Sequence, residues 1–247
     1  MRLIIIRHGD PDYVNDSLTP RGRRGAEALG RYLKDIPIDK AYVSPLGRAA
    51  LTAELGLAHK DLVPEMKPWL REFSPLIDRP DSPGRKHIVW DWLPEDWTAE
   101  PLFFDKDHWC DVPVMREGHV REEYEWVRDG IDTLLEEHGY RRNGLIYESV
   151  RPNHDTVALF CHLGVSYVIL SHLLNVSTMV LWHGFSTAPT SIISVYTEER
   201  RPGKVSFRVN SFGAVPHLER EGIEPSKRAR YVECFGDDET GFEKSFK

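Results

Sequence analysis

The sequence predicts an α/β fold: a three-layer sandwich with a mostly parallel central sheet, helices on both faces and an irregular lid insertion. Apolar runs of strand length, such as Leu3 to Ile6 and Val157 to Cys161, are typical of central strands buried on both faces. Segments with helical spacing follow these runs, and alternating strands and helices form parallel sheets with right-handed crossovers. A chain of 247 residues suffices for one large domain, so we expect residues 1–247 to form a single unit.

The first part of the chain contains two predicted strand–helix pairs. After the opening strand, Thr19 is placed to cap a helix that begins with a proline, and Pro37 ends its apolar periodicity. A short strand, Ala41 to Val43, comes next, and Ser44-Pro45 is expected to open the second helix. Both pairs support the α/β assignment.

The second half of the chain continues the alternation. Residues 120–135 have the clearest amphipathic helical pattern, and an apolar helix from Val165 to Leu174 follows the strand that ends at Cys161. Two further strands are predicted at Ser191 to Tyr196 and Val205 to Val209, with Pro202-Gly203 in the turn between them.

Residues 73–118, called the insertion below, interrupt this alternation. They contain several prolines and four tryptophans, without a long periodicity. A stretch of this kind inside a compact domain is usually a functional lid or disordered, and its aromatic residues favour an ordered lid. The insertion carries a net charge of −5 and an acidic tail, residues 233–247, carries −3, out of −7 for the whole chain. We therefore expect the lid to repel polyanionic ligands.

Composition argues against several classes of function. The acidic balance, with a pI near 5.9, disfavours nucleic-acid binding, which needs a basic face. The three cysteines have no CxxC spacing, which favours a reducing cytoplasm over a disulfide framework. The apolar run at the N-terminus is too short for a signal peptide or a membrane span. No metal-binding motif or cofactor motif is present, and composition does not indicate an oligomeric state.

Cationic side chains follow three of the predicted strands. Arg7-His8-Gly9 follows the first strand, Arg48 comes shortly after the second, and His162-Leu163-Gly164 follows the strand that ends at Cys161. Ligands of open parallel sheets bind beyond the carboxyl ends of the strands, so these side chains are expected at one edge. Arginine forks match phosphate oxygens, and a histidine among arginines is biased toward its neutral, nucleophilic form. The pattern predicts a phosphoryl-transfer site that acts on a small phosphorylated substrate.

The ordered motifs resemble those of the histidine phosphatase superfamily, whose fold is phosphoglycerate-mutase-like. They are Arg7-His8-Gly9, Leu18-Thr19-x-x-Gly22, Ser44-Pro45-x-x-Arg48-Ala49-x-x-Thr52-Ala53 and His162-x-Gly164. The resemblance covers residues 1–72 and about 120–215. It implies that His8 is the nucleophile and carries a transient phosphohistidine, and that Arg7, Arg48 and His162 bind the phosphate and assist catalysis. It also implies that Glu72, in Leu70-Arg71-Glu72, is the general acid and that no metal is needed.

The sequence departs from the family pattern in three places. Val14 stands where phosphatase-like members often have an asparagine, with Asn15 next to it. His162 is followed by Leu163-Gly164, where the family usually has two glycines. No glycine-rich segment follows Glu72. Asp78 or another lid carboxylate therefore remains an alternative for the acid.

The expected function is hydrolysis of a small phosphomonoester by a cytoplasmic histidine-type phosphatase, with no membrane partner. Two alternatives remain open at this point. One is a phosphoglycerate-type phosphomutase, which would have to protect its phosphoenzyme from water. The other is a non-catalytic, phosphate-binding regulatory module that lacks a working acid.

Overall fold

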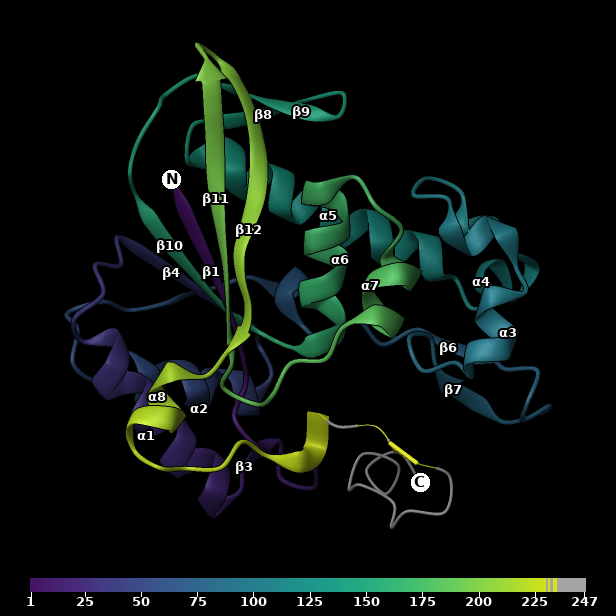
Figure 1. Cartoon of the computed structure of the whole chain (residues 1–247), viewed down its shortest axis with the longest axis horizontal. Helices are drawn as coiled ribbons and strands as arrows, with labels where there is room; N and C mark the ends of the chain where they lie inside the picture. The colour runs from purple at the N-terminus through teal and green to yellow at the C-terminus, as the bar shows by residue number, and fades with distance from the viewer. Residues whose placement is uncertain (230, 232, 235–247) are drawn as a thin grey trace.

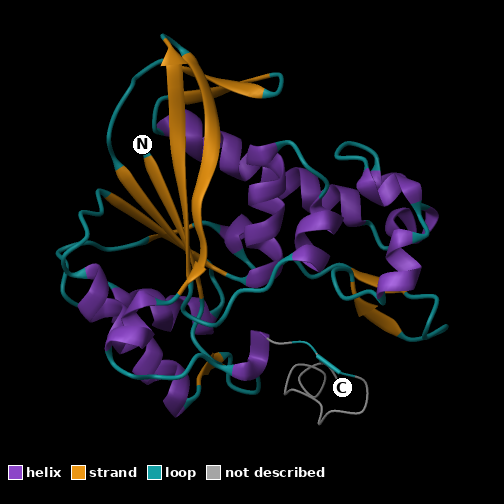
Figure 2. Ribbon diagram, in the orientation of Figure 1, coloured by secondary structure: helices purple, strands orange, loops and turns teal. Residues whose placement is uncertain are grey.

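Eight strands form the central sheet of the computed structural model, which describes residues 1–229, 231, 233 and 234 (Figures 1 and 2). In sheet order they are β5 (Glu65–Met66), β4 (Lys40–Val43), β10 (Thr156–Cys161), β1 (Arg2–Arg7), β11 (Ile192–Arg201), β12 (Lys204–Ala214), β9 (Ile146–Ser149) and β8 (Tyr140–Asn143). The pairs from β5 to β1 are parallel, and the pairs from β1 to β8 are antiparallel. A separate two-stranded sheet is made by β2 (Pro11–Asp12) and β3 (Ser17–Leu18).

Helices cover both faces of the sheet, because the side chains of β1 are buried on both of its faces. Ile4 and Ile6 pack under α1 (Pro20–Leu33) and α2 (Gly47–Gly56), whereas Leu3 and Ile5 join the core on the other face. That second face is covered by α5 (Val120–Glu137) and α6 (Leu163–Leu174), with α7 (Thr178–Gly184) beyond them (Figure 1). The predicted three-layer α/β fold is thus confirmed.

Some boundaries differ from the sequence-based expectation. The second helix begins at Gly47 rather than at Ser44-Pro45, because the Ser44 hydroxyl accepts the Leu46 N–H and so holds the chain in a loop before the helix. The β8–β9 hairpin was not predicted, although Asn143-Gly144 at its turn is a typical hairpin signal and Gly144 has a φ of +60°. This hairpin extends the antiparallel half of the sheet.

The insertion contains short elements rather than a long helix or strand. They are β6 (Leu76–Asp78), β7 (Lys86–Ile88), α3 (Pro94–Thr98), η2 (Pro101–Phe104), η3 (Trp109–Asp111) and α4 (Pro113–Glu117). Trp109 is fully buried, with ring centroids 5.1 Å from Tyr124 of α5 and 5.3 Å from Trp182 of α7. The aromatic residues therefore join the insertion to the core of the second face.

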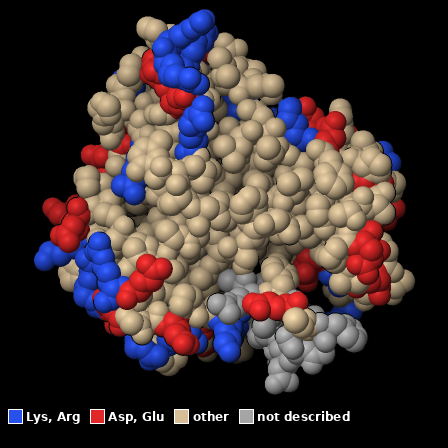
Figure 3. Space-filling model, in the orientation of Figure 1, with Lys and Arg blue, Asp and Glu red and all other residues tan. Residues whose placement is uncertain are grey.

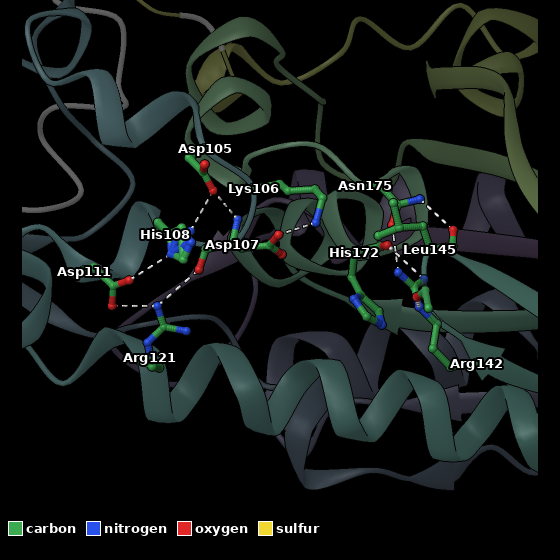
Figure 4. A network of polar contacts seen from close by, with 11 residues as sticks. Asp105, Lys106, Asp107, His108, Asp111, Arg121, Arg142, Leu145, His172 and Asn175 are labelled. Carbon is green, nitrogen blue, oxygen red and sulfur yellow. Dashed lines mark hydrogen bonds and ion pairs between the residues drawn. The ribbon is translucent and has the colours of Figure 1, made fainter.

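Polar contacts reinforce this attachment at the surface (Figure 4). Asp105 accepts backbone N–H groups from residues 107 and 108, and this turn leads to Asp111, which pairs with Arg121 of α5 at 2.8 Å. A second group in Figure 4 joins Arg142 of β8 to Asn175, which ends α6 in a left-handed conformation.

Charged side chains lie mainly toward the rim of the face shown in Figure 3, including the tip of the β11–β12 hairpin. In the described part of the chain, no helix combines the length and the apolarity needed to cross a membrane. The predicted acidic tail, residues 233–247, lies outside the described residues except for 233 and 234.

We expect Trp109→Ala to lower the free energy of unfolding by about 3–5 kcal/mol, because the substitution leaves a cavity between the insertion and the core. Urea denaturation followed by circular dichroism measures this change. Leu102→Ala is the matched control, since Leu102 also lies in the insertion but is 42 % exposed, and its effect should stay within about 0.5 kcal/mol. An unchanged midpoint for Trp109→Ala would show that the insertion unfolds independently of the core.

Candidate active site

A cavity of about 300 Å³ opens at the edge of the sheet where β1, β4 and β10 end. Its wall is made by Arg7, Tyr13, Leu46, Arg48, Arg71, Glu72, Ser74, Ile88, Trp90, Leu163 and Arg228. Three predicted site residues, Arg7, Arg48 and Glu72, are in this lining. His8 and His162 are not, although their chain neighbours Arg7 and Leu163 are. The structure thus brings the five predicted residues together, with the two histidines just behind the wall.

His8 directly follows β1 and is only 2 % exposed. Its Nδ1 lies 2.7 Å from the carbonyl oxygen of Gly9, so Nδ1 is assigned as the donor and Nε2 carries the lone pair. Burial, together with the charges of Arg7 and Arg48, holds the pKa of His8 well below its usual range. The imidazole is therefore neutral, which is the form a nucleophile needs.

His162 follows β10, and its ring centroid lies 5.0 Å from that of His8. Its Nε2 is 2.7 Å from the Ser44 hydroxyl, at the end of β4, while its Nδ1 is buried without a hydrogen-bond partner. Burial and the neighbouring His8, Arg48 and Arg7 lower the pKa of His162 well below its usual range. If Ser44 donates to Nε2, the Nδ1–H of His162 is a buried donor that lacks an acceptor, which is a feature of ligand sites.

Two arginines supply positive charge next to His8. The Nη1 of Arg7 donates to the carbonyl of Thr187 at 2.5 Å, and the Nη1 of Arg48 donates to Asp16 at 2.6 Å. In both side chains Nε is buried without a hydrogen-bond partner. The Nε atoms of Arg2, Arg79 and Arg128 are also buried without a partner, so one such atom does not define a site. Arg7 and Arg48 differ because they share one cavity wall with each other, and this grouping indicates a site for an anion.

Asp16 explains how Arg48 is tolerated at the start of α2, where a cation is unfavourable. One oxygen of Asp16 accepts the Gly47 N–H at 2.6 Å, and the other accepts from Arg48. The anion that offsets the charge of Arg48 at this helix start is therefore a side chain of the protein itself. A guanidinium has five N–H groups, so the contact with Asp16 leaves Arg48 able to bind a ligand as well.

Glu72 supplies the carboxylate of the cavity wall, and among the described residues it is the one acidic side chain in that lining. Its Oε1 accepts the N–H groups of Phe73 at 2.9 Å and Val165 at 3.1 Å, and neither bond uses Oε2. Burial raises the pKa of Glu72 against the opposing effect of Arg48 and Arg7. A raised pKa lets a carboxyl group hold its proton to higher pH, which suits general acid catalysis.

The alternative acid, Asp78, lies elsewhere. It is part of the β6–β7 hairpin and pairs with Lys86 at 2.8 Å, with its side chain 42 % exposed. Asn15 also does not reach the cavity, because its side-chain amide donates to Asp12 at 2.7 Å, and Val14 is 93 % exposed. The asparagine of the family pattern therefore has no counterpart in this cavity wall.

Two glycines of the motifs, Gly9 and Gly22, stand where a larger side chain would collide with the backbone. A Cβ on Gly22 would lie 2.2 Å from the Asp10 carbonyl oxygen, and a Cβ on Gly9 would lie 2.9 Å from the carbonyl oxygen of Gly22. These contacts let the first turn of α1 pack directly on the loop after His8. The Gly9 N–H also donates to Thr52 of α2 at 2.9 Å, which joins both helices to this loop.

Sequence reasoning identified three of the eleven residues of the cavity wall as site residues, and Arg71, Tyr13, Trp90 and Arg228 are among those it missed. Arg71 lies within the motif that contains Glu72, whereas Tyr13, Trp90 and Arg228 carried no local signal. Arg228 lies in η4 (Lys227–Ala229), near the C-terminus, and reaches the cavity through contacts with residues far away in sequence. Among the described residues, no group of three His, Cys, Asp or Glu side chains is arranged to hold a metal ion.

Residues 3–78 match the family model of the histidine phosphatase superfamily (branch 1). A curated relative, fructose-2,6-bisphosphatase TIGAR B of Danio rerio, is 42 % identical over 67 residues. That alignment covers 23 % of this chain and spans only about a quarter (26 %) of the length of the relative. Each of these two sequence matches thus covers less than half of the chain.

Solved structures extend the similarity to most of the chain. A phosphoserine phosphatase variant from Entamoeba histolytica superposes with a TM-score of 0.58 at 19 % identity, covering 88 % of this chain and 98 % of that one. The α-ribazole phosphatase from Shigella flexneri superposes with a TM-score of 0.54 at 21 % identity, covering 87 % and 98 %. The resemblance predicted from the four motifs is confirmed: residues 3–78 match the histidine phosphatase superfamily, and the chain has the fold of its phosphoglycerate-mutase-like phosphatases.

Proposed function

We propose that the protein is a phosphatase that hydrolyses a small phosphomonoester through a phosphohistidine intermediate on His8. The observation that carries this proposal is an oriented histidine of lowered pKa beside three buried nitrogen atoms that lack a hydrogen-bond partner, Nε of Arg7, Nε of Arg48 and Nδ1 of His162. A phosphoryl group bound there would satisfy these donors. The names of the similar proteins, which include bisphosphatase, phosphoserine phosphatase and α-ribazole phosphatase, share this class of reaction.

In the first step, Nε2 of His8 would attack phosphorus, and the bond from phosphorus to the ester oxygen would break. Glu72 would donate its proton to that oxygen, so that the product leaves as a neutral alcohol. In the second step, water would attack the phosphohistidine while the Glu72 carboxylate takes up a proton. Inorganic phosphate would leave, and both His8 and Glu72 would return to their starting forms.

Arg7, Arg48 and His162 would stabilise the charge that spreads over the equatorial oxygens in both transition states. Donors fixed in advance at a partly dry site are effective because they need little reorganisation during the reaction. Thr187 and Asp16 fix the two guanidinium groups from the protein side, and Ser44 fixes the His162 ring.

The insertion would act as the lid of this site. It contributes Ser74, Ile88 and Trp90 to the cavity wall, and a volume of about 300 Å³ favours small substrates. We also predict that residues 1–247 form a single domain and that the protein is located in the cytoplasm.

We expect His8→Ala to lower kcat/KM for p-nitrophenyl phosphate by at least about 10³-fold, because the variant has no nucleophile at the site. The exposed His59→Ala variant is the control and should keep wild-type activity. Acid quenching of the wild type with labelled substrate should trap an acid-labile phosphoprotein that His8→Ala does not form. Wild-type turnover by folded His8→Ala protein would refute the assignment.

We expect Glu72→Gln to lower kcat/KM for an alkyl phosphate by about 10²–10⁴-fold, but to have a much smaller effect with p-nitrophenyl phosphate, whose leaving group needs no proton. Since the pKa of Glu72 is raised, its proton is held at acidic pH and lost as pH rises through that pKa. Wild-type activity on the alkyl ester should therefore fall on the alkaline side, and Glu72→Gln should lack this limb.

Asp78→Asn is the matched control for Glu72, because it removes the alternative carboxylate of the insertion. It should leave both the pH profile and the leaving-group dependence as in the wild type. The reverse result, with Asp78→Asn losing the alkaline limb and Glu72→Gln keeping it, would assign the acid to Asp78.

A further inference from the structure

The cavity wall is more cationic than binding of a single phosphoryl group requires. Arg7 is the chain neighbour of His8, and Arg48 is joined to this loop by Thr52, which accepts the Gly9 N–H and donates to the Arg48 carbonyl. Beyond the effect of burial, the charges of both arginines lower the pKa of His8, and the charge of Arg228 does so to a smaller extent. Arg71 and Arg228 are in the same wall, whereas the acidic side chain of that lining is Glu72. Two of the four arginines thus remain for another part of the ligand.

The carboxylates that pair with these arginines lie outside the lining of the cavity. The pairs are Arg48–Asp16 at 2.6 Å, Arg71–Glu123 at 2.6 Å and Arg228–Asp10 at 3.3 Å. In each pair the arginine is a wall residue and the acid is not. This arrangement holds the guanidinium groups in place while the inner surface stays positive, which favours anionic ligands.

The acidity of the insertion does not reach this surface. Three of its residues, Ser74, Ile88 and Trp90, are in the wall, and none of them is acidic. Asp78, for example, is paired with Lys86 within the β6–β7 hairpin. The sequence-based expectation that the lid repels polyanions is therefore not supported at the cavity, where the charge has the opposite sign.

Arg228 is positioned by a chain segment that is anchored beside the nucleophile. After α8 (Pro216–Arg220), the carbonyl groups of residues 224 and 225 accept hydrogen bonds from Arg21 of α1. The Ser226 hydroxyl then donates to Asp10 at 2.5 Å, and the Arg228 guanidinium lies over the Tyr13 ring. In Figure 1 this segment crosses from α8 past β3 toward the insertion. Asp10 is two residues after His8 and also pairs with Arg228 at 3.3 Å. These contacts hold Arg228 next to the site.

We propose that the substrate carries a second anionic group, a carboxylate or a second phosphate, and that Arg228, with Arg71, binds this group. The inference rests on the proposed function, since it assigns the phosphoryl group to Arg7 and Arg48. Arg228 is thus a specificity-determining residue that the C-terminal segment brings to the cavity.

Three esters with the same carbon skeleton test this proposal. Glycerol 3-phosphate has one anionic group, 3-phosphoglycerate adds a carboxylate, and 2,3-bisphosphoglycerate adds a carboxylate and a second phosphate. Their affinities for the His8→Ala protein are measured by calorimetry, so that the result does not depend on turnover. The rate of phosphate release by the wild type is measured in parallel.

We expect 3-phosphoglycerate or 2,3-bisphosphoglycerate to bind at least about tenfold more tightly than glycerol 3-phosphate, as a charge-assisted contact predicts. Adding Arg228→Gln to His8→Ala should remove most of this preference, and Arg228→Lys should restore part of it. Lys227→Gln is the matched control, because it removes an exposed charge from the same 3₁₀ turn and should leave the preference unchanged. If 3-phosphoglycerate already binds more tightly than glycerol 3-phosphate, the group is the carboxylate. If only 2,3-bisphosphoglycerate does, the group is the second phosphate.

Equal affinity for all three esters would overturn the proposal, and so would an Arg228→Gln variant that weakens all of them by the same factor. The latter result would assign Arg228 to the phosphoryl group itself. If the preference is present in binding but the wild type releases no phosphate, the second-anion site stands and the proposed phosphatase activity fails.

Discussion

The parallel register of β10 between β1 and β4 is the constraint on which the candidate site depends. Arg7 lies opposite Cys161, and Val43 lies opposite Phe160, so the three strands end at nearly the same level. The next residues, His8, His162 and Ser44, therefore meet at one edge of the sheet. A slip of one residue in any of these pairs would turn the strand's side chains to the other face. The contacts between the two histidine rings and between His162 and Ser44 exist only in this register.

Concentrating cations at a buried edge has an energetic cost, and the protein limits it in two ways. The histidines are neutral, because burial and neighbouring arginines lower their pKa values. Three arginines are paired with carboxylates behind the cavity wall. The remaining cost appears as buried nitrogen atoms of Arg7, Arg48 and His162 that lack a hydrogen-bond partner. An anion that accepts hydrogen bonds from these groups would lower this cost.

Much of this arrangement could be predicted from the sequence, because it depends on local signals. Continuous apolar runs mark β1 and β10, and the residues after parallel strands must gather at one edge. Glu72 was found by its motif alone, and its placement in the cavity depends on hydrogen bonds from Phe73 and from Val165 of α6. Distant contacts of this kind leave no spacing pattern in the sequence.

The parts that could not be predicted share this physical origin. Arg228 reaches the cavity through Asp10, which is 218 positions earlier in the chain, and no periodicity connects the two. The net charge of the insertion did not predict the charge of the cavity wall, because the acidic side chains of the insertion do not line the cavity. The contact of Asp16 with the start of α2 likewise could not be predicted, since Asp16 lies 31 positions before Gly47.

The contact between the C-terminal segment and Asp10 has a consequence for how the protein is made. Synthesis proceeds from the N-terminus, and β1, α1, β4 and α2 leave the ribosome long before Ser226 and Arg228. His8, Arg7, Arg48 and β10 can come together in a nascent chain whose cavity wall still lacks Arg228. A chain that stops shortly after α8 would keep His8, Glu72 and His162 with a less cationic wall. The positive charge of the cavity wall is thus completed only in the last stage of synthesis.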